Sequence, residues 1–298
     1  MKYIEKHPMI MIVVGILGVS VSAILVRLSQ APSAVTAAWR LLWTVALMTP
    51  VTLGRAATRQ ELVRLPVRLV LLSILSGLFL AAHFISWFES LKHTTVASST
   101  TIVCTEVVWV SLGYCLFLKG RLTFKAILAI GITVLGSVVI ALADSSAGGT
   151  HLYGDFLALV AAVVVAVYTL LGRTVQKTAS TTVYTYLCYG GCAAALLAVC
   201  LTSGTGLLAY GSNPIVVGLL LAIFCTILGH SVFSWCLKYF SPSFVSASKL
   251  CEPVAAAAIA LFLFGEVPVP TQILGGAMIL GGVLFYSRIE SKNEKSAC

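Results

Sequence analysis

Long apolar runs, each about as long as a membrane-spanning helix, alternate with short polar stretches along the whole chain. A helix needs about 20 predominantly apolar residues to cross the hydrocarbon core of a bilayer. The pattern predicts ten such helices, at residues 9–28, 34–53, 69–91, 95–118, 124–143, 154–173, 181–202, 214–237, 243–264 and 269–287. The first run is too long for the hydrophobic region of a signal peptide and is expected to be a helix. The sequence therefore predicts an all-α integral membrane protein with ten transmembrane helices.

The composition is typical of a chain whose solvent is mostly lipid. Of the 298 residues, 59% are hydrophobic and 10% are charged, and the mean hydropathy is +1.02. Soluble domains have about 25% charged residues. No Gly-Lys dipeptide occurs, which excludes a P-loop and a built-in ATPase. The cysteines lack a Cys-x-x-Cys spacing and the histidines lack a His-x-x-x-His spacing, so neither a metal nor another cofactor is expected.

The positive charges lie mostly on one side of the predicted helices. With the N-terminus in the cytoplasm, every Lys and Arg falls on the cytoplasmic side except Arg27, Arg40, Lys92 and Lys249. Cytoplasmic loops of membrane proteins carry such an excess of Lys and Arg. The net charge of +9 is thus assigned to the inner face of the membrane, and nucleic acid is not an expected partner. Both termini are expected in the cytoplasm, and the chain in the inner (plasma) membrane with the lipid bilayer as its surroundings.

The chain repeats itself with an offset of 146 residues. The pairs at this offset are Lys92 and Lys238, Glu106 and Glu252, Arg27 and Arg173, and Gly136 and Gly282. The offset divides the chain into two units of five helices, residues 1–143 and 154–288, with an external linker at 144–153 and a cytoplasmic tail at 289–298. Because five is odd, the second unit must cross the membrane in the opposite sense. Inverted repeats of this kind are common in secondary transporters, whose substrate site lies near the midplane between the repeats.

Short motifs in both units resemble the drug/metabolite transporter superfamily, in its EamA-type branch with ten helices. They are "AILVRLS" from Ala23, "AAWRLLW" from Ala37, Glu106, Glu252-Pro253 and Gly265-Glu266. The first unit departs from the family pattern, because "FLKGRLT" has Lys119-Gly120 where the family commonly has Gly-Glu. The resemblance implies export or exchange of small metabolites, often amino acids or organic cations. It also implies that helices four and nine line a central cavity, while helices five and ten lie toward the periphery.

Four charged residues fall deep within the predicted helices, namely Arg40, Glu106, Lys249 and Glu252. Each charge at mid-membrane costs about 2.5–3.5 kcal/mol on the insertion scale, so such groups are expected to face a wet cavity or to pair with one another. Lys249 and Glu252 are three residues apart on one helix face. Pro253 removes the usual donor to the carbonyl of Lys249 and predicts a kink there. Two interpretations stay open: structural pairs, Lys249 with Glu252 and Arg40 with Glu106, or charges that bind the substrate.

Aromatic side chains supply further candidates for the cavity wall. His83 and His230 occupy similar places in helices three and eight, although their offset is 147 residues. A histidine side chain changes its charge near neutral pH. Trp43 and Trp109 would add an aromatic face to the cavity. Glycines in helices five and ten fit close packing between the repeats or, in a homodimer, between protomers.

These features together predict a secondary carrier that exports a small metabolite, such as an amino acid or a related carboxylate, by alternating access. Buried positive charge at Arg40 and Lys249 favours a substrate with a carboxylate. Proton coupling through Glu106 or Glu252 is a hypothesis. The alternative is a multidrug exporter of lipophilic cations, with a buried Glu as counter-ion and Trp faces for cation–π contact. A membrane-embedded enzyme is the third class; matched charged helices of opposite orientation argue against it, and no enzyme activity is expected.

Overall fold

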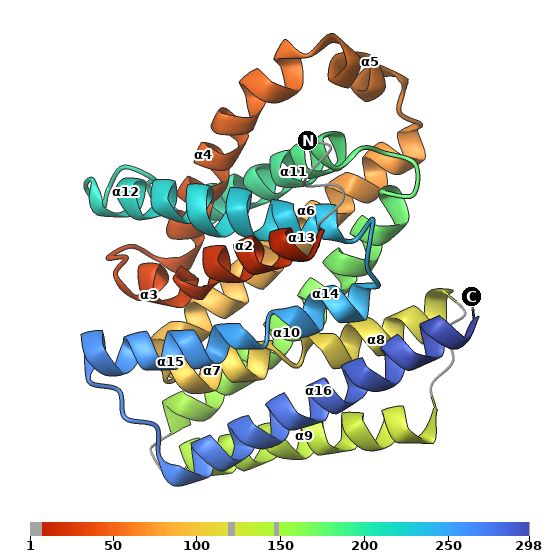
Figure 1. Ribbon diagram of the computed structural model, residues 1–298. Coiled ribbons are helices and arrows are strands. Elements are labelled where there is room, and N and C mark those ends of the chain that lie inside the picture. The colour runs from red at the N-terminus through yellow and green to blue at the C-terminus, as the bar shows by residue number, and fades with distance from the viewer. Residues whose placement is uncertain (1–7, 119–122, 146–148, 298) are drawn as a thin grey trace.

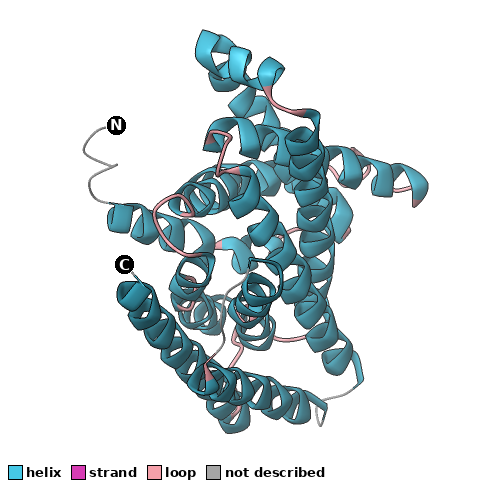
Figure 2. Cartoon of the chain, turned by 90° about the vertical axis from the view of Figure 1, so that its right-hand side faces the viewer, coloured by secondary structure: helices cyan, strands magenta, loops and turns pink. Residues whose placement is uncertain are grey.

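A computed structural model describes residues 8–118, 123–145 and 149–297, and these residues form helices and short connections without a β-strand (Figures 1 and 2). The all-α prediction is confirmed. Within these ranges, seven helical stretches are long and apolar enough to cross a membrane: 8–27, 33–54, 67–93, 96–117, 151–175, 181–202 and 213–236. Lys119 and Gly120, where the first unit departs from the family pattern, lie outside the described residues.

The helices follow the apolar runs of the sequence. The first half of the chain forms α2 (Pro8–Ser20), α3 (Ser22–Arg27), α4 (Ser33–Gly54), α5 (Ala56–Arg64), α6 (Val67–His93), α7 (Val96–Val103), α8 (Glu106–Leu118) and α9 (Phe124–Ser145). The second half forms α10 (Gly149–Val175), α11 (Thr181–Thr202), α12 (Asn213–Leu220), the π-helix η1 (Leu221–His230), α13 (Ser231–Cys236), α14 (Pro242–Ser248), α15 (Cys251–Phe264) and α16 (Pro270–Ala297). The short helix α5 buries none of its residues, in keeping with its polar sequence.

The apolar runs at 95–118 and 243–264 are each broken into a pair of half-helices. The break between α7 and α8 lies at Cys104–Thr105, and the break between α14 and α15 lies at Lys249–Leu250. At each break a backbone N–H bonds the carbonyl three residues back: Thr105 to Ile102 at 3.0 Å, and Leu250 to Ala247 at 3.2 Å. Such 3₁₀-type turns are tighter than α-helical turns. They join the half-helices while changing the direction in which side chains on either side of the break point.

The broken helices cross at the centre of the molecule (Figure 1). The half-helix α7 packs against α15, and α8 packs against α14. Long helices surround this crossing, with α6 packed on α10 and α11, and α2 packed on η1. Both breaks therefore lie inside the protein, where other helices and polar side chains can satisfy backbone groups that lipid could not.

The helices α9 and α16 form a separate layer at the edge of the bundle (Figure 1). Gly136 and Gly275 allow their close approach, because a Cβ atom at Gly136 would lie 2.7 Å from the carbonyl oxygen of Gly275. Small residues permit this kind of helix contact in membranes. The glycines of helices five and ten thus pack against each other within one chain, and a homodimer stays a prediction.

Candidate functional site

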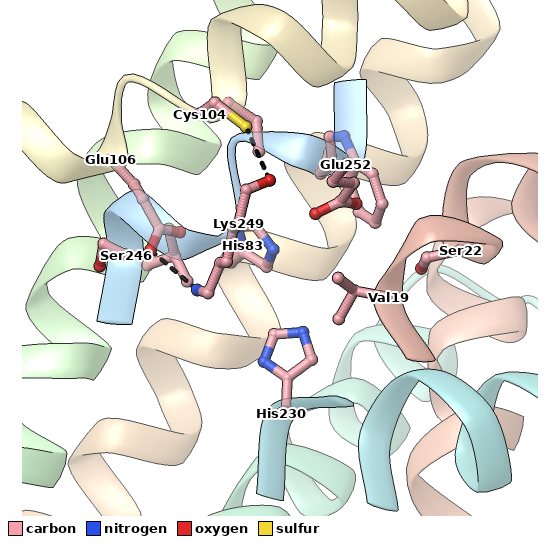
Figure 3. Close-up of a pocket in the computed structure, with 12 residues that line it drawn as sticks. Val19, Ser22, His83, Cys104, Glu106, His230, Ser246, Lys249 and Glu252 are labelled. Atoms are coloured by element: carbon pink, nitrogen blue, oxygen red, sulfur yellow. Dashed lines mark hydrogen bonds and ion pairs between the residues drawn. The ribbon is translucent and has the colours of Figure 1, made fainter. Parts of the chain in front are cut away.

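A buried pocket lies where the broken helices cross (Figure 3). Its volume is about 30 Å³, which is room for about two water molecules. It is lined by Val19, Ser22, His83, Trp87, Val103, Cys104, Glu106, Val165, His230, Ser246, Lys249 and Glu252. Five of the predicted site residues thus meet here: His83, Glu106, His230, Lys249 and Glu252. Three of them lie at the breaks: Glu106 is the first residue of α8, Glu252 is the second residue of α15, and Lys249 lies between α14 and α15.

An ion pair between Glu106 and Lys249 joins the two broken helices across the pocket (Figure 3). Nζ of Lys249 lies 2.8 Å from Oε1 of Glu106, and the two side chains are only 12% and 5% exposed. The two breaks are also in contact, because the thiol Sγ of Cys104 lies 4.0 Å from the carbonyl oxygen of Lys249. The expected structural pairs, Lys249 with Glu252 and Arg40 with Glu106, are not the ones that form. A buried pair like this one is costly to break by removing one partner, because an uncompensated charge remains.

Glu252 is the acid of the pocket without a partner. Its side chain is 8% exposed and forms no hydrogen bond or ion pair with the described residues. It lies in the first turn of α15. Its backbone N–H bonds the carbonyl of Lys249 at 2.8 Å, so the acceptor that Pro253 leaves without its α-helical donor is satisfied. In Figure 3 its carboxylate lies across the pocket from Glu106, on the side of Val19 and Ser22.

His83 and His230 are neighbours in the wall of the pocket, with ring centroids 6.4 Å apart in an edge-to-face arrangement. Nδ1 of His83 lies 3.0 Å from the carbonyl oxygen of Ala161, and its ring stacks on Trp87 at 5.9 Å. His230 ends the π-helix η1. A π-helix has wider turns than an α-helix, so each residue along it faces a different direction than its α-helical counterpart. His83 and His230 are 147 residues apart in the sequence, one more than the repeat offset of 146. The different geometry of the π-helix explains how both side chains nevertheless reach the same wall of the pocket.

Arg40 lies behind the pocket wall and not on it. Its side chain is 0% exposed, and its guanidinium lies over the ring of Phe84 at 4.2 Å. Nε donates a hydrogen bond of 2.7 Å to the hydroxyl of Thr226, one turn of η1 before His230. Nη1 and Nη2 have no hydrogen-bond partner among the described residues. A buried guanidinium with two unused nitrogens is a costly arrangement unless an acceptor reaches it at some stage.

The two other predicted tryptophans point away from the pocket. Nε1 of Trp43 donates a hydrogen bond of 3.1 Å to the carbonyl of Ile215. Trp109 lines a separate apolar groove of about 700 Å³ between α8, α9 and α10. The tryptophan that lines the pocket is Trp87, which is 4% exposed and stacks on His83.

Residues 7–142 and, separately, 152–288 match the EamA-like transporter family. The chain belongs to this family. An uncharacterized transporter of Archaeoglobus fulgidus is 27% identical over 203 residues, which are 68% of this chain and 71% of that protein. An uncharacterized transporter of Clostridium kluyveri is 24% identical over 211 residues, 69% of this chain and 68% of that protein. A solved structure described only as "Crystal structure of protein" has a TM-score of 0.70 at 18% identity, and covers 95% of this chain and 98% of that chain. Together with the apolar helices, these findings identify a multi-pass membrane protein of a transporter family.

At the ends of the helices, this EamA-family transporter has a further ion pair, between Arg27 and Glu266. Nη2 of Arg27 lies 2.5 Å from Oε1 of Glu266 and 3.1 Å from the carbonyl oxygen of Thr94. Oε2 of Glu266 accepts a hydrogen bond of 2.8 Å from the N–H of Val96. This cluster ties together the ends of α3, α6 and α15 and the start of α7. In the second half, Arg173 donates a hydrogen bond to the carbonyl of Leu237, and it forms no ion pair within the described ranges.

The sequence missed several parts of the pocket. No proline marks the α7–α8 break, yet the break at Lys249–Leu250 lies within one residue of the 146-residue offset from Cys104–Thr105. The repeat could therefore have placed it. Val19 and Ser22 reach the pocket beside the break between α2 and α3, for which the sequence shows no turn or proline signal.

Proposed function

We propose that this EamA-family transporter is a secondary carrier that moves a small carboxylate-bearing metabolite, such as an amino acid, across the inner membrane by alternating access. The observation that carries the proposal is the crossing of two broken helices at a buried pocket lined by charges of both signs. Discontinuous helices of secondary transporters form substrate and ion sites near the membrane midplane. Ionisable residues at such depth mark transport pathways far more often than they serve as packing.

Two inverted repeats of five helices each, residues 1–143 and 154–288, are part of this proposal. The two separate family matches, 7–142 and 152–288, support it. So do the helix starts: α7 follows the N-cap Thr95 and α14 follows the N-cap Ser241, which are 146 residues apart. The external linker 144–153, the tail 289–298 and the cytoplasmic termini follow from the distribution of Lys and Arg.

Polar side chains around the pocket favour a substrate with hydrogen-bonding groups. The hydroxyls of Ser22 and Ser246 and Nε1 of Trp87 are buried and have no hydrogen-bond partner among the described residues. Buried polar groups in proteins are nearly always satisfied, by protein, water or ligand. A substrate with hydrogen-bonding groups would satisfy them.

Export is the direction implied by the family resemblance. For proton coupling, Glu252 is the better of the two acids. Glu106 is held by Lys249 at 2.8 Å, so its protonation would break a buried ion pair. Glu252 has no such partner in the described part of the chain, and a proton there would cost no existing contact.

A lipophilic-cation exporter is the second candidate. It is favoured by the same unpaired Glu252 and by Trp87 on the pocket wall, since a buried carboxylate and an aromatic face both attract cations. The ion pair of Lys249 with Glu106 leaves Glu252 as the counter-ion in this candidate.

A thermal-stability screen of the detergent-purified protein separates the two candidates. A ligand that binds only the folded state stabilises it by about 2.7 kcal/mol at a hundredfold excess over its Kd. We expect stabilisation by at least one carboxylate metabolite, reduced by Glu252→Gln and kept by Glu89→Gln, which removes an acid outside the pocket. Stabilisation by lipophilic cations alone would favour the second candidate. No effect of either class would contradict both.

A further inference from the structure

Three of the helices beside the central pocket, α3, α7 and α15, each have one end at a helix break near the pocket. Their other ends meet in a cluster that consists of Arg27, Glu266 and the backbone of Thr94 and Val96. Arg27 lies about 8 Å along the axis of α3 from Ser22, which lines the pocket. The cluster therefore lies between the pocket and one face of the membrane, the face that is expected to be external.

The carboxylate of Glu266 joins the two halves of the chain at this cluster. Oε1 lies 2.5 Å from Nη2 of Arg27, and Oε2 accepts a hydrogen bond of 2.8 Å from the N–H of Val96. Nη2 of Arg27 also donates a hydrogen bond of 3.1 Å to the carbonyl of Thr94. Gly265 ends α15 in the left-handed conformation, with φ at 68°, so the chain leaves the helix immediately before Glu266. One acid of the second half thus holds α3 and the start of α7 in the first half.

The repeat does not reproduce this cluster on the opposite face. Three positions of the cluster have counterparts at the offset of 146 residues, namely Arg27 with Arg173, Glu266 with Gly120, and Val96 with Pro242. A glycine supplies no carboxylate, and a proline has no N–H that could bind one. Arg173 donates a hydrogen bond to the carbonyl of Leu237 and forms no ion pair within the described ranges. The second unit therefore keeps the arginine but lacks both the acid and the N–H that would hold it.

We propose that the Arg27–Glu266 cluster is a gate that closes the central pocket toward one face, and that closure on this face is the resting state of the carrier. This inference rests on the proposed carrier function. In a carrier built from inverted repeats, the two units exchange roles between the inward-facing and outward-facing states. An interaction that is present in only one of two states shifts the equilibrium toward that state. Because the opposite face has no matching acid, the equilibrium favours closure at Arg27, with access to the pocket from the expected cytoplasmic side.

The exposure of the gate suits an interaction that breaks in every transport cycle. The side chains of Arg27 and Glu266 are 27% and 20% exposed, so water can solvate both charges when the two groups separate. Ion pairs that water reaches contribute little to stability. The Glu106–Lys249 pair is less exposed, and its separation would leave two buried charges uncompensated. The central pair is therefore suited to hold the crossing helices together, and the pair at the helix ends is suited to open.

Cys104 can report the opening of the pocket toward each face. It lines the central pocket and is 4% exposed, so a reagent reaches its thiol only when the pocket opens. A membrane-impermeant maleimide is applied to intact cells, which present the external face of the full-length protein, and to inverted membrane vesicles, which present the cytoplasmic face. The alkylation rate of Cys104 is measured by mass spectrometry of its peptide, which separates it from the other cysteines.

We expect Cys104 of the wild type to react faster in inverted vesicles than in intact cells. Glu266→Gln removes the charge of the acid and should lower the ratio of the two rates by about fivefold, since the lost pair is partly exposed. Arg27→Gln should lower the ratio by the same factor, and the double variant should have no larger effect than either single variant, because all three remove the same interaction.

Two matched variants are the controls. Arg27→Lys keeps the positive charge beside Glu266 and should keep most of the wild-type ratio. Glu89→Gln removes an acid near the end of α6 that pairs with Lys92 and lies outside the cluster, and should leave the ratio unchanged.

The outcomes separate the gate from the carrier function. The gate is overturned if the ratio stays at the wild-type value in Glu266→Gln and Arg27→Gln, or if Glu89→Gln lowers it equally. If one of the two gate variants does not fold, the other decides. The carrier function is measured independently, by counterflow in vesicles that contain the wild type. An unchanged ratio with intact counterflow overturns the gate alone, whereas the absence of counterflow removes the carrier function and the gate with it.

Discussion

The Glu106–Lys249 ion pair should couple the two broken helices strongly, and a double-mutant cycle can measure this coupling. The perturbations are Glu106→Gln, Lys249→Met and the two combined. Both side chains are nearly buried and their charged atoms are 2.8 Å apart. Two unit charges about 4 Å apart interact by about 4 kcal/mol at an effective dielectric constant of about 20. Each single variant leaves one uncompensated buried charge and should lose about 3–5 kcal/mol of unfolding free energy.

The double variant leaves no charge behind. It should therefore be less destabilised than the sum of the single variants, by a coupling of about 3 kcal/mol. The assay is reversible unfolding of the detergent-solubilised protein, followed by helix content. The control cycle uses Glu89→Gln and Lys92→Met, a pair at 3.4 Å whose side chains are 36% and 37% exposed. Exposed pairs contribute about 0–1 kcal/mol. A central coupling no larger than that of the control would refute the reasoning.

Three other predictions concern stability and are measured in the same unfolding assay. Arg27→Gln and Glu266→Gln should each cost about 1 kcal/mol and be non-additive, because the pair at 2.5 Å is partly exposed; additive losses would argue against a direct contact. Gly77→Ala should cost about 1–3 kcal/mol, because its Cβ would lie 2.1 Å from the carbonyl oxygen of Cys188, whereas Gly131→Ala, with nothing within 4 Å, should be neutral; equal effects would contradict this packing. Thr95→Ala and Ser241→Ala each remove an N-cap hydroxyl and should each lower the unfolding free energy by about 1 kcal/mol. A loss of stability at only one of the two sites would argue against the proposed repeat.

The sequence predicted the all-α class because the bilayer imposes a simple requirement. A crossing helix must be apolar for about 20 residues; seven stretches of the described residues meet this requirement, and the number of ten stays a prediction. The same requirement exposed Glu106, Lys249 and Glu252, since charges in such runs are rare enough to be conspicuous. All three reach the central pocket.

The partners of these charges could not be predicted from spacing. Lys249 and Glu252 would share a face of a continuous helix, but the break at Lys249–Leu250 separates them. The partner of Lys249 is Glu106, 143 residues away in the chain. This choice depends on the crossing of α7–α8 and α14–α15, which is a tertiary contact that no local pattern encodes.

The sequence also did not predict which face of each helix points toward the pocket. Trp109 is three residues from Glu106, yet it lines the outer groove and not the pocket. Trp43 contacts α12. Apolar residues cover most faces of these helices, so hydrophobic patterning does not distinguish an inner face from a lipid-facing one. The π-helix η1, at whose end His230 lies, shows in the sequence only as the one-residue shift of His230 from the 146-residue offset.

Counterflow in proteoliposomes tests the carrier proposal most directly. Vesicles containing the purified protein are loaded with an excess of the unlabelled amino acid that stabilises it, and are diluted into a trace of the same compound in labelled form. An alternating-access carrier exchanges substrate across the membrane and should transiently accumulate the label far above equilibrium, without ATP; Glu252→Gln should reduce this accumulation. Label that only equilibrates, at the same rate as in vesicles without protein, would contradict the account.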